Sequence, residues 1–165
     1  MPNDAFIALG TNLGDSPNLI RAAVIRLQAW AEWPLSQSSL WQSTPVACPD
    51  GSPPFVNAVV GLAPRAGETA ESLLEKVQAL EIEFGRQRAK ILNEPRLLDL
   101  DLIAFGLETR ATPRLTLPHP RAHLRKFVLL PLSEIAPDLV LPGQTRTIGR
   151  LLAGLRTDEV LTRLT

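Results

Sequence analysis

The segment Pro95-Arg96-Leu97-Leu98-Asp99-Leu100-Asp101-Leu102-Ile103 constrains the fold more than any other part of the chain. Apolar residues recur at every second position from Leu98 to Ala104, which predicts a strand with one buried face. Because side chains alternate along a strand, Asp99 and Asp101 must both lie on the other face. Two neighbouring carboxylates repel each other unless a cation lies between them. The pattern is therefore typical either of a solvated strand face or of a cation site.

The residues around these carboxylates favour the cation site. Oxygen ligands suit Mg²⁺, which binds one or two carboxylates and completes its shell with water and substrate phosphates. The net charge of the chain is +0, which gives no general signal for binding a polyanion. Nevertheless, nine of the 17 basic residues and both histidines lie between Arg86 and Lys126, a segment with only four acidic residues. This local cationic field suits a small, highly charged anion such as a nucleoside triphosphate.

Length and composition favour one domain over residues 1–165 in a reducing compartment. A chain of 165 residues with 45% hydrophobic residues can bury a full core. Its one cysteine, Cys48, cannot form an internal disulfide, which fits the cytoplasm. The apolar run Ala5–Leu9 is too short for a signal peptide, and no run approaches membrane-spanning length. We therefore expect a cytoplasmic protein without a membrane partner.

Hydrophobic periodicity predicts a strand, helix, strand, strand, helix, strand order. Strands are expected at 5–9, 35–41, 55–62 and 98–104, a first helix from an N-cap at Ser16 to about Trp30, and a second from Thr69 or Ser72 to a C-terminal Gly85. The basic segment 86–94 reads as a mobile loop, followed later by a short strand pair near 108–117 and helices near 124–135 and 148–155. This order predicts an α+β fold of the ferredoxin-like split βαβ type, with a central, mostly antiparallel sheet covered by helices.

Several strings, taken in order, resemble one family. They are Ala8-Leu9-Gly10-Thr11-Asn12-Leu13-Gly14-Asp15, Trp41-Gln42-Ser43-Thr44-Pro45-Val46, Pro54-Phe55-Val56-Asn57-Ala58-Val59, Glu81-x3-Gly85-Arg86-x-Arg88, Pro95-Arg96-x2-Asp99-x-Asp101, Pro118-His119-Pro120, Arg125-x-Phe127-Val128-Leu129-x-Pro131-Leu132 and Glu134-Ile135-Ala136-Pro137. Each string alone is weak, but the ordered set resembles the 6-hydroxymethyl-7,8-dihydropterin pyrophosphokinases of folate biosynthesis. The resemblance implies an enzyme that moves the β,γ-pyrophosphoryl group of ATP to the hydroxymethyl oxygen of the dihydropterin and releases AMP.

The resemblance also implies roles for charged residues. Asp99 and Asp101 would hold two Mg²⁺ ions that bridge the triphosphate, and Asp99 would lie close to the attacking hydroxyl. The catalytic set would be Asp99, Asp101, Arg86, Arg96, His119 and Arg125. The ATP-binding set would be Gln78, Glu81, Arg88, Arg96, Leu102, Arg114, Thr116, His119 and Arg125. Arginine suits these positions because its planar fork binds phosphate oxygens in pairs.

A pterin pocket is implied by the same comparison. It would use Ser43, Thr44 and Val46 largely through their backbone, the amide of Asn57, the rings of Phe55 and Phe127, and Asp99. An amide can pair with the row of donors and acceptors on a pterin edge, and aromatic faces hold flat rings. Core packing is the alternative role for the two phenylalanines. Gly10, Thr11 and Asn12 are expected to shape the first turn beneath the site.

Two other classes of protein compete with this interpretation. A nucleotidyltransferase could also use the Asp-x-Asp pair, but it would need a Gly-Ser helix start and a third acid nearby, which this sequence does not offer. A non-catalytic ferredoxin-like module that binds nucleotides or RNA would need exposed aromatic residues on its sheet. Here that face would carry carboxylates, so we expect no nucleic-acid partner. We expect ATP and the pterin as ligands of a monomer.

Overall fold

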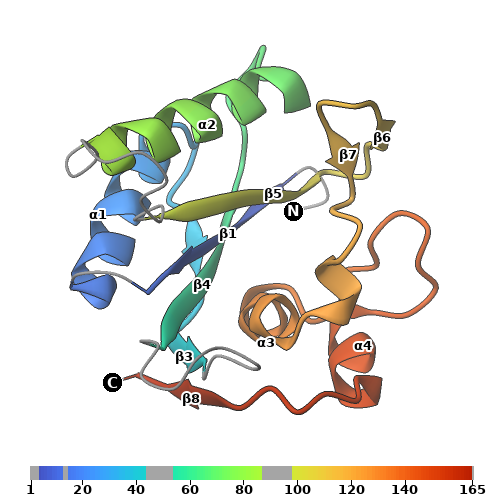
Figure 1. Ribbon diagram of the computed structural model, residues 1–165. Coiled ribbons are helices and arrows are strands. Elements are labelled where there is room, and N and C mark those ends of the chain that lie inside the picture. The colour runs from blue at the N-terminus through green and yellow to red at the C-terminus, as the bar shows by residue number, and fades with distance from the viewer. Residues whose placement is uncertain (1–3, 13–14, 44–53, 87–97, 165) are drawn as a thin grey trace.

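Residues 4–12, 15–43, 54–86 and 98–164 are described by the computed structural model (Figure 1). The elements are β1 (Ala5–Thr11), α1 (Ser16–Gln28), β2 (Ser36–Gln37), β3 (Trp41–Ser43), β4 (Phe55–Leu62), α2 (Ala70–Arg86), β5 (Asp99–Phe105), β6 (Arg110–Ala111), β7 (Thr116–Leu117), the 3₁₀ turn η1 (Ala122–Leu124), α3 (Lys126–Ile135), α4 (Ile148–Gly154) and β8 (Leu161–Arg163). Except for its first residue, the predicted loop 86–94 lies outside the described residues.

The central sheet follows the order β5-β1-β4-β3-β8, and β2 also pairs with β4. Every pairing is antiparallel. Because β1 and β3 are both antiparallel to β4, they run in the same direction with β4 between them. This is the split βαβ arrangement, so the predicted fold class is confirmed.

The sheet is buried on both faces by helices (Figure 1). On one face, α1 and α2 contribute the buried side chains at helical spacing that the sequence predicts, Ile20, Ala23 and Leu27 from α1 and Leu73, Val77, Leu80 and Phe84 from α2. On the other face, α3 packs through residues such as Val128 and Leu132, and α4 packs against α3, with Ile148 buried in the same cluster. One pocket lies between the sheet and the start of α3, and a second lies between α2 and β5.

A β-bulge in β5 changes which residues share a face. Phe6 pairs with Ala104 and Ile7 with Leu102, so Ile103 is an extra residue in β5. The predicted alternation is correct through Leu102 and wrong for Ala104, which packs with Phe6 on the α3 side.

The predicted helix ends are partly wrong. Asp15, not Ser16, is the N-cap of α1, and its side chain accepts no bond from the helix backbone. The second helix starts as predicted, because Thr69 and Ser72 exchange side-chain to backbone hydrogen bonds. However, α2 continues through Gly85 to Arg86, so Gly85 does not end it.

The predicted strand 35–41 is divided into β2 and the start of β3. Ser38, which is buried, lies at the break, and its hydroxyl accepts the backbone N–H of Val59 at 2.9 Å. This side-chain oxygen occupies the place of a backbone acceptor, so the regular ladder with β4 is interrupted. The terminal strand β8, which pairs with β3, has no signal in the sequence analysis.

Candidate active site

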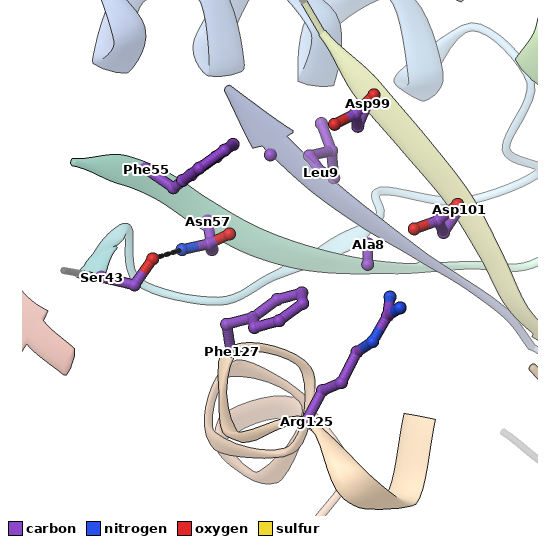
Figure 2. Close-up of a pocket in the computed structure, with 10 residues that line it drawn as sticks. Ala8, Leu9, Ser43, Phe55, Asn57, Asp99, Asp101, Arg125 and Phe127 are labelled. Carbon is purple, nitrogen blue, oxygen red and sulfur yellow. Dashed lines mark hydrogen bonds between the residues drawn. The ribbon is translucent and has the colours of Figure 1, made fainter. Parts of the chain in front are cut away.

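Asp99 and Asp101 form a wall shared by two pockets. Both project from β5 on the face opposite Leu100 and Leu102, as the alternation predicts, and Figure 2 shows them pointing to the same side of the sheet. Each of the two carboxylates lines both pockets. The pair therefore lies where molecules in the two pockets would meet.

We call the first of these the aromatic pocket. It has a volume of about 370 Å³ and lies between the sheet and the start of α3. Its lining residues are Ala8, Leu9, Gly10, Ser43, Phe55, Asn57, Asp99, Asp101, Arg125 and Phe127. Phe55 comes from β4 and Phe127 from α3, and Figure 2 shows their rings on two sides of the space in front of Asn57. A flat ring of limited size suits such a space.

The Asn57 amide is held in a fixed position at the floor of the aromatic pocket. Asn57 is 5% exposed, and its Nδ2 donates to the Ser43 hydroxyl at 2.9 Å (Figure 2). A Cβ atom on Gly10, the residue opposite in β1, would lie 3.3 Å from Asn57 Oδ1. The absence of a side chain at Gly10 therefore leaves room for the amide.

Arg125 brings a positive charge to the edge of the aromatic pocket. Its guanidinium carbon lies 5.4 Å from the centroid of the Phe127 ring, which is a cation–π contact. Figure 2 shows the same side chain reaching into the space in front of Ala8 and Asp101. An anion near Asp101 could therefore be met by Arg125.

We call the second space the polar pocket. It has a volume of about 350 Å³ and lies between α2, β5 and the segment around β7. Its lining residues are Leu74, Gln78, Glu81, Asp99, Leu100, Asp101, Leu102, Arg114, Leu115, Thr116, His119 and Pro120. Compared with the aromatic pocket, it presents more side chains that can pair with charged or polar groups of a ligand.

A firm contact holds the strand that carries the carboxylates, and a weaker one involves a cation beside it. Glu81 of α2 accepts the backbone N–H of Leu100 at 2.9 Å, which holds the outer edge of β5 between Asp99 and Asp101. Arg114 donates to Glu75 at 3.1 Å, and both side chains are more than half exposed. An exposed pair of this kind is weak, so a phosphate could replace Glu75 as the partner of Arg114.

His119 owes its position to the β-bulge. The carbonyl of Ile103, the extra residue of β5, accepts the backbone N–H of His119 at 2.8 Å. Burial lowers the pKa of His119 below its usual value; the charge of Asp101 opposes this effect, and the guanidinium groups of Arg125 and Arg121 add to it. Because Nδ1 accepts the Arg121 N–H at 3.1 Å, the neutral ring carries its proton on Nε2. His119 can therefore donate one hydrogen bond in the polar pocket.

The structure brings most of the predicted site residues to these two pockets. Of the predicted pterin-binding residues, Ser43, Phe55, Asn57, Asp99 and Phe127 line the aromatic pocket. Of the predicted ATP-binding residues, Gln78, Glu81, Leu102, Arg114, Thr116 and His119 line the polar pocket, whereas Arg125 lines the aromatic one. Thr44, Val46, Arg88 and Arg96 lie outside the described residues, and Arg86 is described only as the last residue of α2.

Sequence reasoning missed two small residues, a proline and the leucines Leu9, Leu74, Leu100 and Leu115. Ala8 and Gly10 line the aromatic pocket from β1, and Pro120 lines the polar pocket. The alternation of small residues at 8 and 10, next to a strand with carboxylates at 99 and 101, was the available signal. Gly10 was expected to shape a turn; it instead lies within β1.

The donor set at the shared wall fits magnesium. Within the described part of the chain, no group of three or more His, Cys, Asp or Glu side chains is arranged to hold a metal by itself. Two carboxylates on one strand face are instead the oxygen-only, incomplete set that Mg²⁺ uses when substrate phosphates supply further ligands. The polar pocket beside them leaves space for such phosphates.

Comparison with known proteins identifies the family. The sequence pattern of the 7,8-dihydro-6-hydroxymethylpterin-pyrophosphokinases matches residues 6–137, which is most of the chain. The chain belongs to this family. Its activity is pyrophosphoryl transfer in folate biosynthesis, with ATP and the hydroxymethyldihydropterin as substrates. This assignment decides against the nucleotidyltransferase and the RNA-binding module.

Individual relatives agree with the family assignment. Three bacterial 2-amino-4-hydroxy-6-hydroxymethyldihydropteridine pyrophosphokinases are similar over most of their length. The relative from Haemophilus influenzae is 40% identical over 84% of this chain and 85% of its own. The one from Pseudomonas aeruginosa is 40% identical over 90% and 89%, and the one from Synechocystis is 37% identical over 90% and 74%.

A solved structure agrees on the fold. The chain is similar to wild-type HPPK-DHPS from Plasmodium falciparum crystallised with pteroate, with a TM-score of 0.68 over 92% of this chain. It covers 42% of that longer chain and shares 14% sequence identity with it. The likeness concerns the fold alone.

In this chain, no helix among the described residues has the length and apolar character needed to cross a membrane.

Proposed function

We propose that this pyrophosphokinase binds the pterin in the aromatic pocket and the nucleotide in the polar pocket, so that the reacting groups meet at Asp99 and Asp101. The observation that carries the proposal is that these two carboxylates line both pockets. A bimolecular transfer needs the attacking oxygen and the phosphorus atom in contact and in line, and adjoining pockets with a common wall provide this.

The pterin would be held by shape and hydrogen bonding. Its ring would lie between Phe55 and Phe127, and its polar edge would face the Asn57 amide. Since Asn57 is buried and already bonded to Ser43, little conformational entropy is lost when it pairs with a ligand. The hydroxymethyl group would then point toward Asp99, at the end of the pocket shared with the nucleotide.

The nucleotide would be held mainly by charge. Gln78, Glu81 and Thr116 offer polar contacts to the nucleoside, while Arg114, His119 and Arg125 would approach the phosphates from the side opposite Asp99 and Asp101. His119 suits this role when neutral, because its Nε2 proton can be donated to a phosphate oxygen. Arg86, Arg88 and Arg96 belong to the same proposal through the family resemblance.

Asp99 and Asp101 would hold two Mg²⁺ ions. Bound magnesium would neutralise charge on the triphosphate and polarise the group that is transferred. The protein's own part is to fix two carboxylates on a rigid strand, held from behind by Glu81, and to orient the hydroxymethyl oxygen toward the β-phosphorus. The bond from that phosphorus to the oxygen that leaves with AMP would break as the new ester bond forms, and the proton of the hydroxymethyl group would be released to solvent.

We further propose a cytoplasmic monomer that acts as a single domain. The one cysteine fits a reducing compartment. The two pockets are built from elements of one chain, so a second copy is not needed to complete either of them.

The products separate this reaction from related ones. With ATP, Mg²⁺ and 6-hydroxymethyl-7,8-dihydropterin, we expect AMP and the pterin pyrophosphate to form in equal amounts, as followed by anion-exchange chromatography. Omission of the pterin should abolish AMP formation, and EDTA should stop it until Mg²⁺ is restored. Formation of ADP in place of AMP would contradict the proposal, because it would show transfer of one phosphoryl group.

A further inference from the structure

Glu134, which lies outside both pockets, connects the two elements that form opposite sides of the aromatic pocket. Its carboxylate accepts three hydrogen bonds, from Ser39 N at 3.1 Å, from Ser39 Oγ at 2.8 Å and from Trp41 Nε1 at 2.7 Å. Glu134 belongs to the last turn of α3, whereas Trp41 is the first residue of β3. All three bonds therefore join α3 to the β3 segment.

Each of the two elements that Glu134 connects also carries a residue that lines the aromatic pocket. On α3, Phe127 and Glu134 are seven residues apart, about two helical turns, so they lie on the same side of the helix. On β3, Trp41 and Ser43 are two residues apart and share a face of the sheet. Trp41 is paired in register with Asn57, and Ser43 accepts the hydrogen bond that orients the Asn57 amide. A shift of β3 relative to α3 would thus move Ser43 relative to Phe127 and, through the hydrogen bond from Asn57 to Ser43, change the orientation of the Asn57 amide.

The break between β2 and β3 makes this contact possible. Ser38 occupies the interruption, donating its backbone N–H to the Val59 carbonyl and its hydroxyl to the Ser39 carbonyl. After the break, both the amide and the hydroxyl of Ser39 are directed to Glu134 rather than to a neighbouring strand. These bonds lie at an exposed position, where one alone would be weak, but all three end on one charged acceptor and together give the junction a defined geometry.

We infer that Glu134 is a positioning residue for the pterin, which sets the distance between the Phe127 side and the Asn57 side of the aromatic pocket. The inference rests on the proposed placement of the pterin in that pocket. Glu134 touches neither substrate and acts through Trp41 and Ser39. Its loss should weaken pterin binding while the polar pocket, built on α2, β5 and the β7 segment, keeps its affinity for ATP.

The test compares Glu134→Gln with Trp41→Phe and with the control Ser133→Ala. The glutamine keeps the side-chain size but can direct an NH₂ group at the two donors of Ser39. The phenylalanine removes the indole N–H and leaves an aromatic ring. Ser133 is the neighbour of Glu134 on α3, and its hydroxyl donates only within the helix, to Leu130 O, so the control perturbs α3 without touching β3.

For Glu134→Gln we expect the KM for the pterin to rise about tenfold, whereas kcat and the KM for ATP should stay within about twofold. Trp41→Phe should raise the pterin KM about threefold, because one of three donors is lost. In the double variant, the pterin KM should rise by less than the product of the two single increases, since both changes disrupt the same contact. Ser133→Ala should match the wild type. Calorimetric titration with the pterin, in the presence of a non-hydrolysable ATP analogue, should rank the variants by pterin affinity in the same order.

Two results would overturn the inference. One is a folded Glu134→Gln protein with unchanged pterin affinity; the other is a loss of equal size for pterin and ATP in both variants, which would mean a merely structural role. If Glu134→Gln does not fold, Trp41→Phe and Ser39→Ala decide by the same comparison. A different result would contradict the proposed pterin pocket itself. In that case the wild type would make AMP from ATP and the pterin, but changes at Phe55 and Phe127 would leave the pterin affinity unchanged.

Discussion

The two pockets that meet at Asp99 and Asp101 are built in different ways. In the aromatic pocket, the amide of Asn57 is buried and bonded to Ser43, and apolar rings form the sides. In the polar pocket, the cation Arg114 is exposed and is paired with Glu75, which is also exposed. The first pocket can select a ligand by shape and fixed hydrogen bonds, whereas the second must rely on charge. Changes in one pocket should therefore affect mainly one substrate.

The largest expected effect comes from the wall that the pockets share. Asp99→Asn and Asp101→Asn should each lower turnover on the order of a thousandfold or more, because each removes a charged ligand from the proposed metal site. AMP formation is the measurement, with circular dichroism to show that the fold is retained. Glu83→Gln is the matched control, since this carboxylate pairs with Arg26 on exposed parts of α1 and α2. Near-normal turnover in either aspartate variant would separate these residues from the chemistry.

The next effect should be confined to the aromatic pocket. Phe127→Ala should cost about 1–3 kcal/mol of pterin affinity, by analogy with bases stacked on aromatic side chains. Calorimetric titration with each substrate is the measurement, and ATP affinity should change much less. Phe127 also packs against the buried cluster that contains Val128 and Leu132 of α3, so some loss of thermal stability is expected as well. Equal losses for both ligands would assign the ring to the core alone.

The polar pocket should show the opposite selectivity. Arg114→Ala should weaken Mg-ATP binding by about tenfold, because a charge-assisted contact to the phosphates is lost. The pterin affinity should be unchanged, since Arg114 does not line the aromatic pocket. Titrations at low and high salt add a check: the variant should show a weaker salt dependence of ATP binding than the wild type. A pterin-specific loss would contradict the division between the pockets.

A smaller effect is expected from one added methyl group. In Gly10→Ala, the new Cβ would lie 3.3 Å from Asn57 Oδ1, so the amide must shift by a few tenths of an ångström. We expect a cost of about 1 kcal/mol in pterin affinity from this overpacking. Competition binding with a fluorescent pterin can measure it. A larger loss of ATP affinity than of pterin affinity would show that Gly10 serves the other pocket.

The sequence predicted those elements whose signals are local. The strand 55–62 has the bounds predicted from its apolar run, and the alternation around Asp99 correctly placed both carboxylates on one face. Three errors have nonlocal causes. Ser38 breaks a predicted strand because its hydroxyl bonds to β4; the bulge at Ile103 turns Ala104 to the other face; and β8 depends on pairing with β3. A single sequence does not show such partners.

The same difference between local and nonlocal signals applies to the residues of the candidate site. Resemblance to a family supplied the residues that carry charges or rings, and those whose side chains the structure describes line the two pockets. Ala8 and Gly10 were missed because they contribute space, through a small side chain at Ala8 and none at Gly10, and this is visible only beside Asp101 and Asn57. The contact between Glu134 and Trp41 joins residues 93 positions apart, so spacing along the chain could not indicate it.

The most direct test of two pockets with one shared wall is an NMR titration of the backbone amides. Addition of the pterin should shift the amides of Ser43, Asn57 and Phe127, and addition of Mg²⁺ with a non-hydrolysable ATP analogue should shift those of Gln78, Arg114 and Thr116. Asp99 and Asp101 should respond to both ligands. If the pterin instead shifted the Gln78, Arg114 and Thr116 set, or if the two aspartates responded to neither ligand, the arrangement described here would be contradicted.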